Sequence, residues 1–160
     1  MATTTENLAS ATKPEYAALI ESLNQDLARE YQAIIAYVVY SQTLKGAEYM
    51  NIAAELEKHA AEELNHAILI AKQIDYLGGA PTVQPLSVQV TDDSEEMLEA
   101  DLQNETTTVR NYRERVRQCE QLGEYAMAEV IRQILVNEQE HQIDLATALG
   151  IAVPRVGAAA

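Results

Sequence analysis

Four long segments of this chain carry apolar residues at alternating steps of three and four, the pattern of a helix that buries one face. They cover residues 16–44, 48–77, 93–122 and 124–149. Helices of about 26–30 residues are about 40–45 Å long, and a chain of this size can bury such lengths only by packing them against one another. Hydrophobic residues make up 48 %, with only 6 Gly and 4 Pro, so the chain predicts an all-α four-helix bundle.

The connections between these segments set the topology. Gly46 and Gly123 stand in short links, so the first and second helices, and the third and fourth, should form antiparallel hairpins. The stretch "GGAPTVQPLSVQV" at 78–90 has two prolines and alternating β-branched residues, which predicts a long extended crossover, and Asp93 followed by Glu96 predicts the start of the third helix. The second and third helices would then run parallel. We expect an antiparallel bundle over residues 14–149, a flexible tail at 1–13 and a short tail at 150–160.

The apolar residues of each helix form a stripe, called its seam below. Each seam is interrupted near its middle by residues that are costly to bury. A glutamate takes a core position in all four helices, and in the second and fourth a histidine follows it three residues later. The interrupting residues are Glu30, Glu63, His66, Glu105, Glu138 and His141. They should lie at one level of the bundle.

The spacing of the glutamates repeats. Thirty-three residues separate Glu30 from Glu63, and thirty-three separate Glu105 from Glu138. Little other identity is visible between the halves of the chain. We interpret the chain as two copies of one metal-binding hairpin.

The physical reason for a metal is charge. An unpaired buried carboxylate costs several kcal/mol, so four of them in a bundle core would be protonated or would unfold it. Two divalent cations supply a charge that balances four carboxylates, and neutral imidazoles complete the ligand shells. A Glu and a His three residues apart lie on one helix face, where the carboxylate can bridge two ions while the histidine binds one.

Single features of this pattern also have plain structural explanations. One Glu-x-x-His pair in a glutamate-rich helix is weak evidence, but two pairs with two further seam glutamates at matched spacings favour the metal interpretation. His59 lies on the seam one turn before Glu63, and it would either contact a ligand, bind metal itself, or be an ordinary buried histidine. Cys119 is interpreted as a small core residue. The acidic residues that neighbour the motifs but fall outside the seams, interpreted as surface charges, are Glu57, Glu62 and Glu140.

Two tyrosines, Tyr37 and Tyr112, follow the first glutamate of each hairpin by seven residues. They are either simple core aromatics or donors of a hydroxyl hydrogen bond to a bridging glutamate. The second role is the prediction for Tyr37, and for Tyr112 both remain open.

Charge and composition exclude several classes of function. With 11 Lys and Arg against 25 Asp and Glu, the formal charge of −14 repels phosphate backbones and attracts metal cations, so no nucleic acid partner is expected. The single cysteine fits a reducing compartment, and no signal peptide or membrane-length apolar run is visible. We expect a soluble cytoplasmic protein without a membrane partner.

The motifs resemble those of the ferritin-like di-iron proteins, and most closely bacterioferritin. The similar stretches are "LNQDLAREYQAIIAY" (23–37), "AAEELNHA" (60–67), "YLGGAPTVQP" (76–85), "DSEEMLEADLQNE" (93–105) and "ILVNEQEHQIDL" (134–145). The resemblance implies two irons per chain, with manganese as an alternative metal. It also implies terminal ligands at Glu30 and Glu105, bridges at Glu63 and Glu138, nitrogen ligands at His66 and His141, and a tyrosine beside the site at Tyr37.

Two departures from bacterioferritin bear on cofactor and assembly. Leu64 stands where bacterioferritins have a haem-ligating methionine directly after the bridging glutamate, which argues against haem. The segment after Leu149 is too short for the family's fifth helix, which lines contacts of the 24-subunit cage. A homo-oligomeric cage of twelve subunits, as in the Dps-like ferritins, or of twenty-four therefore stays open.

The resemblance implies a ferroxidase that oxidises Fe(II) to Fe(III) with O2 or H2O2 and stores or detoxifies iron in a hollow cage. One alternative is a non-storing di-iron or di-manganese oxidase or peroxidase that protects against oxidative stress, because ligand type alone does not separate Fe from Mn. The other is a metal-free helical interaction module, against which the buried charges argue.

Overall fold

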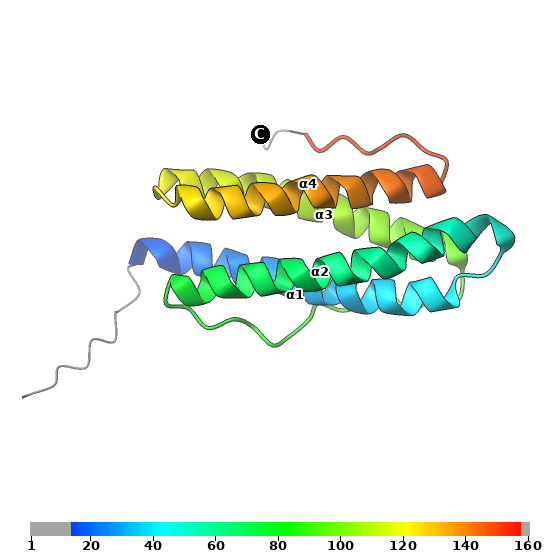
Figure 1. The fold of residues 1–160 in the computed structure, drawn as a ribbon, viewed down its shortest axis with the longest axis horizontal. Helices are drawn as coiled ribbons and strands as arrows, with labels where there is room; N and C mark the ends of the chain where they lie inside the picture. Colours follow the sequence, from blue (N-terminus) through cyan, green and yellow to red (C-terminus); the bar gives the residue numbers. More distant parts are fainter. Residues whose placement is uncertain (1–13, 158–160) are drawn as a thin grey trace, which may run out of the picture.

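The computed structural model describes residues 14–157, and these form four long helices packed side by side (Figure 1). In chain order they are α1 (Pro14–Thr43), η1, a short 3₁₀ turn (Ala47–Tyr49), α2 (Met50–Tyr76), α3 (Ser94–Gln121) and α4 (Tyr125–Ala148). α1 and α2 form one antiparallel hairpin, α3 and α4 form the other, and the crossover between them lets α2 and α3 run in the same direction (Figure 1). The predicted all-α four-helix bundle is confirmed. The expected flexible tail, 1–13, lies outside the described residues, as do the last three residues of the chain.

The helix boundaries follow local chemistry. The Oδ1 atom of Asp93 accepts hydrogen bonds from the backbone N–H groups of Glu95 and Glu96 at 2.9 and 3.0 Å, so the predicted N-cap of α3 is confirmed. α2 begins at Met50, two residues later than predicted, because the preceding residues form the tighter turn η1 after the chain reverses at Gly46.

The polar level divides the apolar core in two. One cluster of buried side chains, which includes Leu23, Ile74 and Met127, fills the end of the bundle where α3 meets α4. A second cluster, which includes Leu56 and Leu98, fills the opposite end. The six interrupting Glu and His residues are buried as well and make up the polar level between the two clusters.

The crossover is held along α1 by side chains eight residues apart. Asn24 accepts a hydrogen bond from the backbone N–H of Thr82 at 2.7 Å, and Gln32 and Tyr40 each donate to a crossover carbonyl at 2.5 Å. Each of these three side chains of α1 therefore contacts the crossover. The extended crossover thus covers α1 along much of its length, as Figure 1 shows.

After α4 the chain turns back along the second hairpin (Figure 1). Arg113 donates to the carbonyl of Val156 at 2.8 Å, and Gln142 donates to the carbonyl of Pro154 at 3.2 Å, so this segment lies against α3 and α4. None of the helices between residues 14 and 157 is both long enough and apolar enough to cross a lipid bilayer.

Candidate metal centre

The six predicted ligand residues meet in the middle of the bundle. α1 contributes Glu30, α3 contributes Glu105, and α2 and α4 each contribute one Glu-x-x-His pair. Each of the six residues is at most 3 % exposed. The helices therefore bring together, away from solvent, the residues that the sequence placed at one level.

The six residues form two overlapping groups. Within each group, one oxygen or nitrogen per residue lies within 4.8 Å of the corresponding atoms of the others. One group is Glu30, Glu63, His66 and Glu138, and the other is Glu63, Glu105, Glu138 and His141. Glu63 and Glu138 belong to both groups, so their carboxylates lie between two positions that could each hold a cation.

Several of these donor atoms are close together without being hydrogen-bonded. The Nδ1 atom of His141 lies 2.9 Å from Oε1 of Glu63, yet neither atom has an aligned hydrogen-bond partner within residues 14–157. The same holds for Oε2 of Glu30 and for both carboxylate oxygens of Glu138. Buried polar atoms are rarely left in this state, and converging lone pairs are the arrangement that a metal ion satisfies.

Each tyrosine bonds to a glutamate of the opposite hairpin. The hydroxyl of Tyr37 donates to Glu105, and the hydroxyl of Tyr112 donates to Glu30. The prediction that Tyr37 would bond to a bridging glutamate was wrong, because its partner Glu105 belongs to one of the two groups and is not shared. For Tyr112, whose role was left open, the partner is likewise an unshared glutamate, Glu30. The two tyrosines have equivalent contacts.

The outer nitrogens of the two histidines are held in the same crossed manner. Nε2 of His66 lies 2.9 Å from Oδ1 of Asn137, and Nε2 of His141 lies 2.7 Å from Oε2 of Glu62. Asn137 and Glu62 each directly precede a shared glutamate, Glu138 and Glu63. Each contact turns Nδ1 of the histidine toward the cluster. Interpreting Glu62 as a surface charge alone was therefore wrong. The sequence feature that could have identified both Glu62 and Asn137 is their position directly before a shared glutamate.

Burial and close charges change the protonation of the carboxyl groups. Burial, and then the charges on Glu138 and Glu30, raise the pKa of Glu63 well above its ordinary value. Burial and Glu138 likewise raise the pKa of Glu105. Burial also acts to raise the pKa of Glu138, but the close imidazoles of His141 and His66 outweigh burial and lower it.

The histidines take up protons in the metal-free cluster. Burial acts to lower the pKa of His66, but contacts with Glu138, Glu30 and Glu63 outweigh it and raise the pKa to about 12. Burial opposes protonation of His141 as well, and Glu138 and Glu105 raise its pKa to about 9. The raised pKa values of Glu63, Glu105, His66 and His141 mean that protons would compete with a cation for this cluster.

His59 is buried beside the cluster. Its ring stacks on His141 with ring centroids 4.0 Å apart, and its Nε2 lies 3.2 Å from Oδ2 of Asp144. Burial and the neighbouring His141 lower the pKa of His59 to about 4, against the opposing effect of Asp144, so its imidazole is neutral near pH 7. Of the three roles left open for His59, contact with a ligand residue is the one that the structure shows directly.

The remaining residues named from the sequence lie away from the cluster. Glu57 and Glu140 are exposed, as expected, and Cys119 is buried in the apolar core. Leu64 follows Glu63 in sequence but is 53 % exposed on α2. Three buried charged residues were missed because they lie off the seams: Asp26 and Arg115, which pair with each other at 2.6 Å, and Asp101, which is 2 % exposed.

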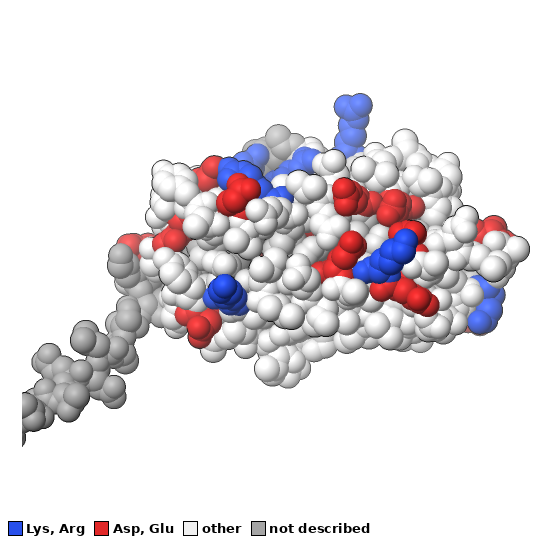
Figure 2. All heavy atoms as spheres, viewed as in Figure 1, with Lys and Arg blue, Asp and Glu red and all other residues white. Residues whose placement is uncertain are grey.

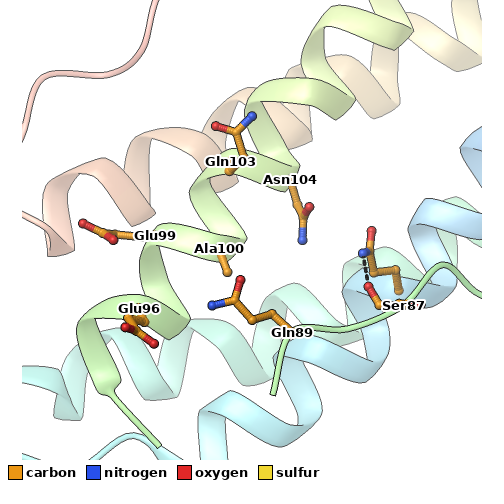
Figure 3. A pocket seen from close by; sticks show the side chains of 8 residues that line it. Ser87, Gln89, Glu96, Glu99, Ala100, Gln103 and Asn104 are labelled. Carbon is orange, nitrogen blue, oxygen red and sulfur yellow. Dashed lines mark hydrogen bonds between the residues drawn. The ribbon is translucent and has the colours of Figure 1, made fainter. Parts of the chain in front are cut away.

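A polar hollow of about 550 Å³ lies elsewhere, between the crossover and α3 (Figure 3). In this view Gln89 and Asn104 project toward the same space, while Glu99 points away from it. Its lining includes side-chain amides and carboxylates but no histidine. The cluster in the bundle core is therefore the better candidate for metal chemistry.

Comparison with known proteins agrees with this geometry. A family described as the ferritin-like domain matches residues 20–152. The bacterioferritin of Brucella melitensis is 29 % identical over 139 residues, covering 82 % of this chain and 86 % of the relative. The bacterioferritin of Desulfovibrio desulfuricans is 32 % identical over 126 residues, covering 78 % and 70 %.

A solved structure gives the same result. A crystal structure from Bacillus anthracis, described as that of ferritin-like, diiron-carboxylate proteins, superposes with a TM-score of 0.82 at 34 % identity. The match covers 86 % of this chain and 99 % of that one. Because the family match takes in most of α1 and all of the other three helices, the protein belongs to the ferritin-like di-iron superfamily.

Proposed function

We propose that this protein is a ferroxidase, which oxidises Fe(II) to Fe(III) with O2 or H2O2 at the Glu–His cluster and stores the product inside a hollow shell of identical subunits. One observation carries the proposal: two buried four-residue groups share Glu63 and Glu138. The relatives named bacterioferritin and the solved structure described as diiron-carboxylate support iron as the metal.

The donor set fits two divalent irons. Four carboxylates and two imidazoles are the ligand types that Fe(II) and Mn(II) accept, and the carboxylate charge balances two divalent cations. The buried oxygens of Glu30, Glu63 and Glu138 that lack hydrogen-bond partners among the described residues provide free lone pairs for such ions. We assign Glu30 and His66 to one ion, Glu105 and His141 to the other, and Glu63 and Glu138 to both.

The protein's contribution to the reaction is to hold and orient these ligands. Bound iron supplies one electron per ion, and O2 or H2O2 accepts the electrons. Tyr37 and Tyr112 fix the carboxylates of Glu105 and Glu30, while Asn137 and Glu62 hold the two imidazoles with Nδ1 toward the cluster. Burial of all six side chains excludes bulk water, so only solutes that enter the bundle reach the centre.

A shell is proposed from the surface of the subunit. Several large apolar side chains of α1 and α2 are exposed, and a neighbouring copy would cover them: Ile35, Val38, Val39, Leu64 and Ile68. The formal charge of −14 per chain would concentrate cations at such an assembly. Native mass spectrometry tests this, since storage requires a large closed oligomer and a non-storing di-metal enzyme does not.

The test of the activity is an anaerobic Fe(II) titration followed by addition of O2 or H2O2. We expect saturation at about two irons per chain and a rapid rise of Fe(III) absorbance. Wild-type protein that oxidised iron no faster than buffer would refute the ferroxidase proposal.

A pair of variants assigns the activity to this cluster. Glu63→Ala removes a carboxylate shared by both groups, so it should abolish the rapid phase while circular dichroism shows an intact helical fold. Glu57→Ala is the matched control, because it removes an exposed carboxylate of the same helix that lies outside the cluster and accepts a hydrogen bond from Gln42 across the hairpin. It should oxidise iron at the wild-type rate.

A further inference from the structure

The second hairpin and the segment that follows α4 border a pocket that the proposed reaction does not use. Its volume is about 460 Å³, and small-molecule sites commonly have volumes of about 300–1,000 Å³. α3 contributes Arg113, α4 contributes Gln139, Gln142 and Ile143, and residues 153–156 form the remaining wall. We call it the C-terminal pocket.

The wall formed by residues 153–156 is fixed to both helices. Nη1 of Arg113 donates to the carbonyl of Val156 at 2.8 Å. Gln142, which is 3 % exposed, donates to the carbonyl of Pro154 at 3.2 Å and to Oγ1 of Thr106 at 3.0 Å. The pocket is therefore already formed in the folded chain, which lowers the entropy cost of binding a ligand there.

The charge of the C-terminal pocket is opposite to that of the whole molecule. Arg113 and Arg155 are among its eight lining residues, and none of the eight is acidic. By contrast, Glu96 and Glu99 line the hollow between the crossover and α3. Figure 2 shows Lys and Arg side chains along the upper edge of the molecule, the edge that the C-terminal segment follows in Figure 1. On a chain with a formal charge of −14, this pocket is a place where an anion can bind.

The two arginines are free to bind an external anion. Arg113 is partly buried and Arg155 is exposed, and neither forms an ion pair with any residue from 14 to 157. A guanidinium group has five N–H donors, and the bond to Val156 takes up a single one of those on Arg113. Planar guanidinium groups bind the oxygens of carboxylates and phosphates through paired hydrogen bonds.

The charge of two arginines matches a phosphate better than a carboxylate. A phosphate monoester carries about −1.5 to −2 charges at pH 7, so it balances two guanidinium groups. A single carboxylate would leave one of the two uncompensated. The pocket therefore favours a phosphate group.

The other half of the lining is apolar. Its residues are Ile143, Val153, Pro154 and Val156. Ile143 and Val153 are 40 % and 37 % exposed, so each still has surface that a ligand could cover. Inorganic phosphate would leave this surface in water, whereas a phosphate ester with an apolar group would bury it.

We propose that the C-terminal pocket binds a small molecule in which a phosphate is joined to an apolar group. The phosphate lies between Arg113 and Arg155, and the apolar group covers Ile143 and Val153. None of the eight lining residues belongs to the six-residue Glu–His cluster, so this binding requires no iron.

Isothermal titration calorimetry of the full chain at constant ionic strength tests the ligand class with three probes. Phenyl phosphate has both features, inorganic phosphate lacks the apolar group, and benzoate has a carboxylate in place of the phosphate. We expect phenyl phosphate to bind about tenfold or more tightly than either of the others, because only it uses both halves of the pocket.

Two variants assign the binding to this pocket. Arg155→Gln should weaken phenyl phosphate binding by about tenfold or more, since it removes one of the two charges. Arg117→Gln is the matched control, because it removes the same charge from an exposed arginine of α3 that pairs with Glu114 outside the pocket. Val153→Ser should weaken the binding of phenyl phosphate and leave that of inorganic phosphate unchanged. Circular dichroism should show the wild-type helical signal for all three variants.

Each contrary result overturns the inference. Phenyl phosphate that did not bind at millimolar concentration, or that bound no more tightly than inorganic phosphate or benzoate, would exclude the proposed ligand class. Equal weakening by Arg155→Gln and Arg117→Gln would show attraction to the surface as a whole and no site at the pocket. Since iron enters none of these measurements, such a failure would leave the ferroxidase proposal as it stands.

Discussion

The two cluster histidines are oriented by neighbours from the opposite hairpin. An imidazole that binds metal through Nδ1 needs its Nε2 hydrogen held elsewhere, or the ring rotates and the free energy of binding falls. Asn137 provides this acceptor for His66 at 2.9 Å. We therefore expect metal affinity to depend on residues outside the six-residue cluster.

Asn137→Ala should lower the affinity of the cluster for metal by about 10-fold to 100-fold, because the ring of His66 loses its outer partner. The measurement is competition between the protein and a fluorescent chelator for Mn(II), which avoids oxidation. Asn65→Ala is the control, since Asn65 is exposed beside His66 in the sequence. Equal affinities for the two variants would show that the Asn137 contact does not hold the ring.

The sequence predicted the six cluster residues because they interrupt apolar seams, and such interruptions are visible without knowing which helices are neighbours. The sequence did not predict the hydrogen bonds that join one hairpin to the other. That Tyr37 bonds to Glu105, or Asn137 to His66, depends on which helices lie opposite each other at that level. Periodicity along a single helix does not contain this information.

At the scale of the elements, the crossover packs tightly against the first hairpin at Gly79. A Cβ atom at this position would lie 2.6 Å from Cγ2 of Ile20 and 3.1 Å from Cγ2 of Ile74. Both neighbours are β-branched, so neither side chain can turn away freely. Glycine is required here by close packing of the crossover against the first hairpin.

Gly79→Ala should lower the free energy of unfolding by about 1–3 kcal/mol, the usual cost of forcing an extra carbon into packed side chains. Urea unfolding followed by circular dichroism measures the change. Gly157→Ala adds the same methyl group where no atom lies within 4 Å, so it should leave stability unchanged. A Gly79→Ala variant as stable as wild type would show that the crossover can move away from the hairpin without a loss of unfolding free energy.

Long periodic helices were the part of the fold that the sequence predicted best. The residues predicted at alternating steps of three and four, such as Leu23, Leu56 and Leu98, are nearly all buried, and two further ones, Ile34 and Leu44, are partly buried. The short turn Ala47–Tyr49 was not predicted, since three residues are too few to show a period. An element could therefore be predicted only when it was long enough to show a periodic pattern.

At the scale of the whole molecule, the bundle consists of two apolar cores joined by one polar layer. Raised pKa values at Glu63, Glu105, His66 and His141 favour the protonated form of each group when no metal is bound, and these protons would neutralise the layer. With metal, the same residues give up these protons. Stability should therefore respond to pH in opposite ways in the two states.

In the metal-free protein, each of these four groups has a pKa raised above its value in the unfolded chain. Their contribution to stability is complete below the unfolded pKa values and is lost as the pH rises through the raised ones. Between about pH 7 and pH 9, the free energy of unfolding should fall by up to about 1.4 kcal/mol per pH unit for each group that keeps its proton only when folded. His59, with a pKa lowered to about 4, opposes this only below its ordinary value of 6.5.

Urea unfolding in the presence of a chelator, and again with Mn(II), measures both states across this range. The metal-free protein should lose stability toward pH 9, and the Mn(II) form should gain stability relative to it, since fewer protons compete with the cation. Glu63→Gln should weaken the pH dependence of the metal-free protein, because an amide carries no titrating proton. A metal-free protein that became more stable from pH 7 to pH 9 would mean that protons do not neutralise the polar layer, and the charge argument for two cations would lose its basis.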